Sequence, residues 1–502
     1  MGKPSINFVL HAHLPWLKGA GRWPFGEEWL YQCMLDTYLP LLDLLARLRT
    51  GGIRGSITMG ITPVLIEMLR DGALVAGFDA YLDSRIELLE EDIVLFGTGD
   101  AALRQLAIGA RAAIQNMRKH WREKYNRDLI SGFREFAQSG DIEIMTSAAT
   151  HAYLPLLDSG NAVEAQLATG IEITAEAFGK RPTGVWLPEC GFDPSVIPIL
   201  ERLGIEFLYA DERATHNLTP DVDRPFLYPN SKVAYFVRHP MARGELMDTD
   251  LGYPGNSWYR EFYKRHNNSG MRYWRVTSKN ASLSEKEPYE AARALEQIRL
   301  HAADFAKKIE ALKNESSQAY LTFTFDAELF GHWWGEGILW LEETLVQLQH
   351  DQTADFLSPS EYLASHARPE ELALPRSSWG VGGDDRIWSN PKTGDYWNTV
   401  RSAQRRFEEL SNFADVDSPL YLQAARELFL LQSSDWPFMI SNQAADGYPM
   451  ERIQMHASRF HECAAALGEE PANQEIIDAA LESDTLFERL NLVAFRKTAE
   501  RA

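Results

Sequence analysis

Short hydrophobic runs alternate with longer segments of helical periodicity through most of the chain before residue 370. The runs are continuously apolar or β-branched, which is typical of strands buried on both faces of a sheet. Seven of them are strand-like: residues 6–10, 53–59, 142–147, 184–187, 205–209, 233–237 and 320–325. Between them, segments such as residues 38–49 place leucines at the spacing of one buried helix face. Strands that alternate with helices predict an α/β fold with a parallel sheet.

The segment between the second and third runs is too long for one crossover helix. Residues 101–138 have the pattern of a long amphipathic helix with its charges on one side. We therefore predict a helical insertion near residues 65–135.

The last part of the chain contains no convincing strand after about residue 400. Apolar residues there recur at helical spacing in residues 407–413, 420–431 and 472–498. The stretch 367–383 is rich in Pro and Gly and is the best candidate for a domain boundary. We therefore expect an α/β domain over residues 1–370 and an all-helical C-terminal domain over residues 371–502.

Composition narrows the class of protein. The 502 residues are 45% hydrophobic and 24% charged, as in soluble globular proteins. A net charge of −21 disfavours nucleic acid and anionic membranes as partners. The three cysteines provide neither a disulfide framework nor zinc-ligand spacing. We see no signal peptide and no apolar stretch long enough to span a membrane, so we expect a cytoplasmic protein.

Polar side chains follow five of the strand-like runs. In a parallel α/β barrel the carboxyl ends of the strands meet on one rim, which forms the active face. The residues at these ends are His11 and His13, Thr150 and His151, Glu189, Asp211 and Glu212, and Asp326 and Glu328. The sequence therefore predicts a polar site at this rim.

Two of these carboxylates lie among aromatic residues. Glu189 is in VWLPECGF and Asp326 is in FTFDAELFGHWWGEG, so both are expected to be partly buried and to need a role there. Two carboxylates brought together by a fold permit glycoside hydrolysis or transfer. The alternatives are a structural pairing with arginine and, for the second acid, Glu328 or Glu336.

The pair His11 and His13 has a rival interpretation. Two histidines at i, i+2 on a strand project to the same side and can bind a metal, as in metal-dependent amidohydrolases and deacetylases. That function needs further ligands, for which His151 or Asp211 is available, and no HExxH motif accompanies them. Contact with sugar hydroxyls or a carboxylate, or a structural role, stays open. Phosphate-binding and dinucleotide-binding glycine motifs and a GxSxG elbow are absent.

Tryptophans recur nine residues apart in residues 377–397, among Gly, Asp and Asn. Such a segment is typical of a loop, and Trp379 and Trp388 are candidates for contact with a ligand, with packing at the domain interface as the alternative. The same choice applies to Asp435 and Trp436.

Taken together, these motifs resemble glycoside hydrolase family 57. The resemblance rests on HAHLP at 11–15, GDIEIMTSAATHAYLPLL at 140–157, GVWLPECGF at 184–192 and FTFDAELFGHWW at 323–334. Further motifs resemble the branch that contains 1,4-α-glucan branching enzymes and related α-amylase-like proteins: EEWLYQCMLDTYLPLL at 27–42, GYPGNSWYREFY at 252–263, SSWG at 377–380 and SDWPF at 434–438.

This resemblance implies an incomplete (β/α)7 barrel, an α-glucan substrate and a retaining mechanism without a metal or organic cofactor. It implies that Glu189 is the nucleophile and Asp326 the acid/base, which would lie about 5–5.5 Å apart. It also implies substrate contacts at His11, His13, Trp29, His151, Arg260, Trp379 and Asp435.

Transfer to a glucan rather than to water depends on a lid. In branching enzymes of the family a loop after the nucleophile strand carries a tyrosine over the site. Here the corresponding stretch, residues 216–240, is short, and Tyr228 is the nearest candidate. A short lid favours water as acceptor. We therefore expect a 1,4-α-glucan branching enzyme, with an α-1,4-glucan hydrolase as the alternative and a metal-dependent amidohydrolase or deacetylase as a remote one.

Overall fold

The computed structural model describes residues 3–22, 24–55, 57–216, 218, 222–248, 252–312 and 319–496. Its centre is a nine-stranded sheet with the order β6-β7-β5-β4-β3-β2-β1-β8, in which β9 also pairs with β1. The strands are β1 Ser5–Ala12, β2 Ile57–Ile61, β3 Ile142–Ser147, β4 Gly184–Trp186, β5 Phe207–Ala210, β6 Phe226–Leu227, β7 Ala234–Val237, β8 Tyr320–Asp326 and β9 Asp355–Phe356. All pairings are parallel except that of β6 with β7.

The sheet curls into a barrel that does not close fully. Its last two long strands, β7 and β8, meet only at an isolated parallel bridge between Arg238 and Thr322. There the backbone N–H of His239 donates to the Thr322 carbonyl over 2.8 Å. The predicted incomplete α/β barrel is therefore confirmed, and the curl brings the carboxyl ends of the strands to one rim.

All seven predicted strands are present. The second begins at Ile57 rather than at residue 53. The sequence missed β6 and β9 because each is only two residues long, too short to show a hydrophobic period.

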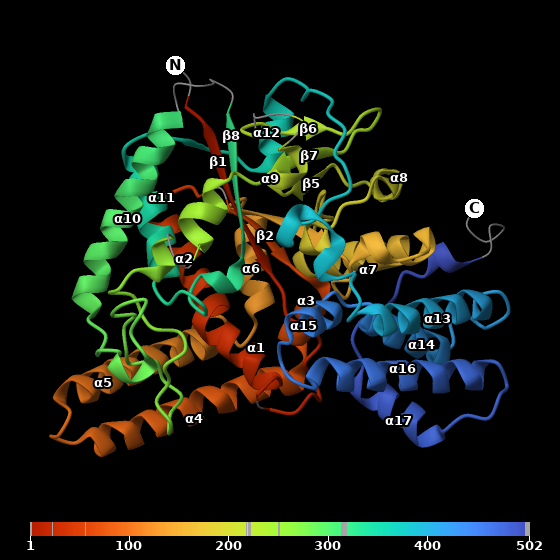
Figure 1. Ribbon diagram of the computed structural model, residues 1–502, viewed down its shortest axis with the longest axis horizontal. Helices are drawn as coiled ribbons and strands as arrows, with labels where there is room; N and C mark the ends of the chain where they lie inside the picture. Colours follow the sequence, from red (N-terminus) through yellow and green to blue (C-terminus); the bar gives the residue numbers. More distant parts are fainter. Residues whose placement is uncertain are drawn as a thin grey trace.

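Helices surround the sheet and form an insertion beside it (Figure 1). The barrel helices are α1 Glu27–Cys33, α2 Leu39–Thr50, α3 Pro63–Arg70, α6 Leu129–Gln138, α7 Gly160–Phe178, α8 Ile197–Arg202, α9 Glu212–Thr215, α10 Ala291–Leu312, α11 Gly337–His350 and α12 Pro359–Ser365. The predicted helical insertion is a long hairpin of α4 Gly72–Phe96 and α5 Ala101–Lys119, whose N-termini are capped by Asp71 and Asp100.

The prediction of one helix over residues 101–138 is wrong. The chain passes through a π-helical turn and then places Asn126 and Arg127 at φ values of 48° and 60°. Left-handed residues end a right-handed helix, and Asp128 then caps the N-terminus of α6.

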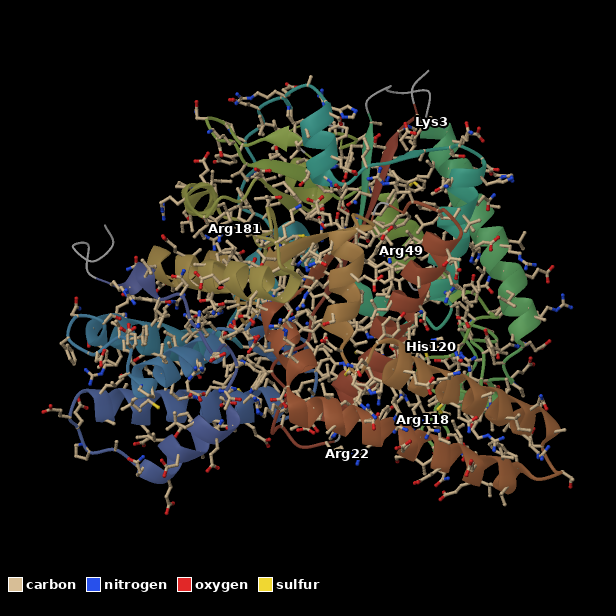
Figure 2. The ribbon with its side chains drawn as sticks, turned by 180° about the vertical axis from the view of Figure 1, so that it is seen from behind. Lys3, Arg22, Arg49, Arg118, His120 and Arg181 are labelled. Carbon is tan, nitrogen blue, oxygen red and sulfur yellow. The ribbon has the colours of Figure 1, made fainter. Side chains whose placement is uncertain are left out.

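Contacts to one buried carboxylate fix the insertion to the barrel. His120 and Lys124 both reach the Asp43 carboxylate on α2, over 2.6 and 2.8 Å. Within the insertion, Arg118 on α5 pairs with Asp83 on α4 over 2.5 Å. Figure 2 labels Arg118 and His120 on the rear of the molecule, where the hairpin meets the barrel. The hairpin therefore has a fixed position next to the rim.

The C-terminal helices form a separate group at one side of the barrel (Figure 1). They are α13 Gly394–Leu410, α14 Pro419–Leu431, α15 Asp435–Asn442, α16 Tyr448–Leu467 and α17 Gln474–Ser483. No strand occurs among the described residues after 400, which confirms an all-helical C-terminal domain. No described helix meets the length and apolarity that crossing a membrane requires.

Two details of this region differ from prediction. Phe413 lies beyond the end of α13 and is 62% exposed, so it does not continue the apolar face of that helix. The predicted helix over residues 472–498 ends at Ser483, and Phe487 adopts a φ of 55°. The end of that prediction, beyond residue 496, lies outside the described residues.

A buried polar cluster joins the C-terminal helices to the barrel. Glu427, His456 and Asp484 are fully buried, and His456 Nδ1 contacts Glu427 over 2.8 Å. The indole N–H of Trp16, in the loop after β1, donates to Asp484 over 2.8 Å. Arg459 neutralises the same carboxylate. The loop that carries His13 is therefore anchored on the C-terminal helices.

We predict that Trp16→Phe lowers the free energy of unfolding by about 1–3 kcal/mol more than Trp340→Phe, as urea denaturation measures it. Both side chains are buried, but only Trp16 donates a hydrogen bond to a charged partner, because the Trp340 indole nitrogen has no partner among the described residues. Equal losses in the two variants would show that the Trp16 hydrogen bond does not stabilise the fold.

Candidate active site

A cleft of about 960 Å³ opens at the carboxyl ends of the strands. One side is formed by strand ends of the barrel, and the other by α15 and the loop before α13. Nine of the site residues proposed from sequence line it; they are His11, His13, Trp29, His151, Glu189, Asp326, Trp379, Trp388 and Asp435. Residues that are up to 424 positions apart in the chain therefore share one cavity.

Glu189 lies in a tight turn directly after β4. Its φ and ψ of 63° and 21°, and the φ of 49° at Cys190, are left-handed values that non-glycine residues rarely adopt. Such strain persists where the surroundings hold it, and it clusters at functional sites. The turn aims the half-buried carboxylate into the cleft.

Two donors hold the Glu189 carboxylate. The indole N–H of Trp379 donates to Oε2 over 2.8 Å, and the Ser434 hydroxyl donates to Oε1 over 3.2 Å. The Trp379 backbone N–H also donates to the Glu189 carbonyl over 2.9 Å. Burial raises the pKa of Glu189, which these hydrogen bonds oppose. Each carboxylate oxygen is thus oriented by a residue from outside the barrel strands.

Asp326 ends β8, where it stands in register with His11 on β1. It is half-buried, and its carboxylate has no hydrogen-bond partner among the described residues. Burial, with Glu328 and Glu189 nearby, raises the pKa of Asp326 well above its ordinary value. The surroundings of Asp326 therefore favour its protonated form.

The alternative acids have different surroundings. Glu328 is 3% exposed and accepts hydrogen bonds from the Tyr38 hydroxyl and, over 3.3 Å, from the His13 backbone N–H. Burial raises its pKa to about 7. Glu336 accepts a hydrogen bond from the Arg260 backbone N–H over 3.3 Å and does not line the cleft. Asp326 is therefore the acid that is available to a ligand.

A chain of neutral groups leads from His11 to Glu189. His11 Nε2 lies 3.0 Å from His151 Nε2, and His151 Nδ1 lies 2.8 Å from the Ser434 hydroxyl. Burial lowers the pKa of both histidines, so both are neutral. Because Ser434 gives its single proton to Glu189, it accepts from His151 Nδ1–H, and His151 Nε2 in turn accepts from His11 Nε2–H. The buried histidines thus fix the Ser434 hydroxyl toward the carboxylate.

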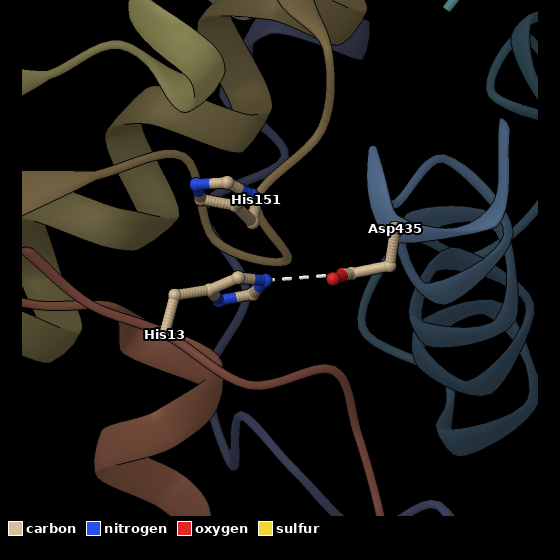
Figure 3. A group of neighbouring side chains, drawn as sticks. All are labelled: His13, His151 and Asp435. Carbon is tan, nitrogen blue, oxygen red and sulfur yellow. Dashed lines mark hydrogen bonds and ion pairs between the residues drawn. The ribbon is translucent and has the colours of Figure 1, made fainter. Parts of the chain in front are cut away.

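His13, His151 and Asp435 bring three possible metal ligands within 4.8 Å of one another. Figure 3 shows the two imidazole rings stacked face to face, with a dashed line from His13 to Asp435. The ring centroids are 3.8 Å apart at 19°, and His13 Nε2 lies 3.0 Å from the Asp435 carboxylate. The nitrogen lone pairs of stacked rings lie in nearly parallel planes, and the nitrogens of His151 already face His11 and Ser434, so the two rings do not converge on one ion. This geometry favours a hydrogen-bonded polar surface over a metal centre.

Asp211, the other metal ligand considered from sequence, is paired with arginine. Arg213 contacts its carboxylate over 2.6 Å and Arg238 over 2.8 Å. Arg213 also donates to the carbonyls of Trp379 and Gly380. Sequence reasoning missed both arginines, although a buried acidic pair at a strand end indicates that cations lie nearby. They fix the loop whose indole holds Glu189.

Aromatic side chains form much of the cleft wall. Trp333 and Phe438 line the cleft and are 41% and 42% exposed. Phe25, Trp29 and Phe262 line it as well. Exposed aromatic faces suit the apolar faces of sugar rings. The sequence did not select these positions, because aromatic residues of the core and of a surface cannot be separated by pattern alone.

Trp388 borders the cleft but is only 1% exposed and stacks on Tyr153 at 4.4 Å. Trp397 belongs to α13 and donates to the Trp388 carbonyl over 2.7 Å. The chain from residue 377 to the start of α13 is therefore a loop that presents Trp379 to the cleft, whereas Trp388 and Trp397 pack into the structure.

Two residues proposed from sequence lie elsewhere. Arg260 lines an adjoining cavity, with its guanidinium 4.0 Å from the ring of Tyr289. Tyr228 packs near Phe192, with ring centroids 6.0 Å apart, and does not line the cleft. Residues 217 and 219–221 of the lid segment lie outside the described part of the chain.

Comparison with known proteins finds similarity to the same group of enzymes in both parts of the chain. The model of glycosyl hydrolase family 57 matches residues 7–375, and that of the 1,4-alpha-glucan branching enzyme C-terminal region matches residues 399–495. The 1,4-alpha-glucan branching enzyme of Thermococcus kodakarensis is 34% identical over 93% of this chain and 74% of its own length.

Solved structures of two similar proteins have the same overall fold as this chain. The family 57-type branching enzyme of Pyrococcus horikoshii superposes with a TM-score of 0.94 at 32% identity, over 99% of this chain and 97% of that one. The alpha-amylase AmyC of Thermotoga maritima superposes with a TM-score of 0.88 at 28% identity, over 99% of both chains. The extent of these matches shows that the chain belongs to glycosyl hydrolase family 57.

Proposed function

We propose that this protein is a 1,4-α-glucan branching enzyme, which cleaves an α-1,4 linkage and transfers the released chain to a glucan 6-hydroxyl. The observation that carries the proposal is the pair of half-buried carboxylates at the base of an aromatic cleft. Glu189 is held by two hydrogen-bond donors, and burial next to Glu328 and Glu189 raises the pKa of Asp326 well above its ordinary value. The similarity to branching enzymes along the chain, including the C-terminal region, supports it.

The two carboxylates divide the reaction between them. Asp326 gives its proton to the glycosidic oxygen as that bond breaks, and Glu189 attacks the anomeric carbon to form an ester. The deprotonated Asp326 then takes the proton of the acceptor hydroxyl, whose oxygen bonds to the anomeric carbon as the Glu189 ester breaks. The net configuration is retained, and neither step requires a metal or an organic cofactor.

Water competes with the glucan acceptor in the second step. The walls of the cleft exclude part of this water with Trp29, Phe262, Trp333 and Phe438. We propose that these faces also stack on glucosyl rings, with His13 and Asp435 as hydrogen-bonding partners of sugar hydroxyls.

A second candidate function is α-1,4-glucan hydrolysis. It is favoured by Tyr228, which lies away from the cleft and does not cover the carboxylates. The structural similarity to the alpha-amylase of Thermotoga maritima also supports it. The two functions share the same carboxylates and differ in the acceptor.

We predict that Glu189→Gln lowers activity on amylose by at least about 10³-fold, because the amide cannot form the ester intermediate. The measurement is proton NMR of new α-1,6 linkages, with reducing ends assayed in parallel. New α-1,6 linkages with few reducing ends in the wild-type protein identify a branching enzyme, and reducing ends without branches identify a hydrolase. Wild-type turnover in a folded Glu189→Gln variant would exclude Glu189 as the nucleophile.

We predict that the loss caused by Asp326→Ala depends on the leaving group. An α-maltosyl fluoride releases fluoride without a proton from the enzyme, so the first step should lose roughly 10²-fold less activity than with amylose. The pre-steady-state burst of fluoride, which reports the first step alone, and amylose cleavage measure the two losses, with Glu189→Gln as the control that fails on both. Equal losses for both substrates would mean that Asp326 is not the proton donor.

A further inference from the structure

A second cavity of about 680 Å³ adjoins the cleft. Gln32 and Arg265 line both, so the two hollows meet at these side chains. None of the functions assigned above uses this cavity. Its size is within the range of 300–1,000 Å³ that is typical of ligand sites.

Three chain segments form a wall between the two hollows. On α1, Trp29 faces the cleft and Glu28 faces the second cavity. In the loop after β8, Trp333 faces the cleft, whereas Gly331 and Gly335 face the cavity. The third segment, residues 260–272, contributes to both sides. A ligand in the second cavity therefore lies across one wall from the carboxylates.

The cavity contains a buried cation with two unused donor atoms. Arg85, on α4, is 9% exposed, and its Nε and Nη2 atoms have no hydrogen-bond partner among the described residues. Its Nη1 atom pairs with the Glu28 carboxylate over 3.7 Å, and its guanidinium lies 5.6 Å from the Tyr81 ring. A buried guanidinium whose donors are unused is costly, and hydroxyl groups of a ligand can satisfy it.

The segments that line the cavity differ in polarity. Helix α5 contributes the apolar side chains of Ala113, Ile114 and Met117. The loop of residues 265–272 contributes the amides of Asn267 and Asn268 together with Arg265 and Arg272. Glucosyl rings also have apolar faces and hydroxyl edges, so the cavity matches the two-sided polarity of a neutral glucan.

We propose that this second cavity binds the acceptor α-glucan chain while the cleft holds the donor chain on Glu189. The proposal rests on the branching function, since a transferase must hold two glucans at once. In the transfer step the acceptor 6-hydroxyl, entering over Gln32 and Arg265, gives its proton to Asp326. Its oxygen bonds to the anomeric carbon as the bond from that carbon to Glu189 breaks. The helical insertion is therefore part of the acceptor site.

The test fills the cavity from the exposed face of α5. Ala113 lines the cavity, and its neighbour Ala112 is also exposed but does not line it. Ala113→Trp should lower the ratio of α-1,6 linkages to reducing ends formed from amylose about tenfold, because acceptor binding is blocked and water takes its place. The matched control Ala112→Trp should leave this ratio at the wild-type value.

The outcomes separate this inference from the function on which it rests. If the wild-type protein forms no α-1,6 linkages, the branching function fails. If the wild-type protein branches and Ala113→Trp keeps the wild-type ratio, the acceptor site is elsewhere and the inference is overturned. An equal loss of branches and reducing ends in Ala113→Trp would also overturn it, because the cavity would then serve the donor.

A binding measurement gives a readout without turnover. Isothermal titration of the Glu189→Gln variant with maltoheptaose should show two sites per chain, and the further change Ala113→Trp should remove one. Arg85→Met should weaken the same site about tenfold, whereas a folded variant that binds as before would show that Arg85 does not contact the acceptor. A single site in Glu189→Gln that Ala113→Trp leaves unchanged would contradict the proposal.

Discussion

The site depends on how the Glu189 carboxylate is held. Its two oxygens accept hydrogen bonds from Trp379 and Ser434, which precede α13 and α15, and its backbone is in a left-handed conformation. A free carboxylate on a strained turn would rotate and relax. The C-terminal helices and the loop before them therefore complete the candidate active site, and the barrel alone does not. This explains why the first loop of the barrel is anchored on the C-terminal helices through Trp16 and Asp484.

Burial distributes the protons in this site. It keeps His11 and His151 neutral, so that their hydrogen bonds have a single direction toward Ser434. It raises the pKa of both Glu189 and Asp326, and the neighbouring Glu328 raises that of Asp326 further. The surroundings of the two acidic groups in one cleft therefore differ, and this difference is the basis of the separate roles that we propose for them.

Much of this arrangement could be predicted from sequence. Strands buried on both faces leave continuous apolar runs, so the barrel strands were found, and polar residues at their ends identified the rim. The hydrogen bonds of Ser434 and the pairing of Asp211 with Arg213 could not be predicted, because they join distant segments without any local period. The second cavity also depends on how α5 packs, which is a tertiary property.

The central claim is that Glu189 forms a covalent glycosyl ester. Incubation of the wild-type protein with 5-fluoro-α-maltosyl fluoride, followed by mass spectrometry of peptides, tests it most directly, because this reagent slows the breakdown of the ester more than its formation. The account predicts one maltosyl adduct per chain, on the peptide that contains Glu189. An adduct on Asp326 or Glu328 instead, or release of the sugar with no adduct, would contradict it.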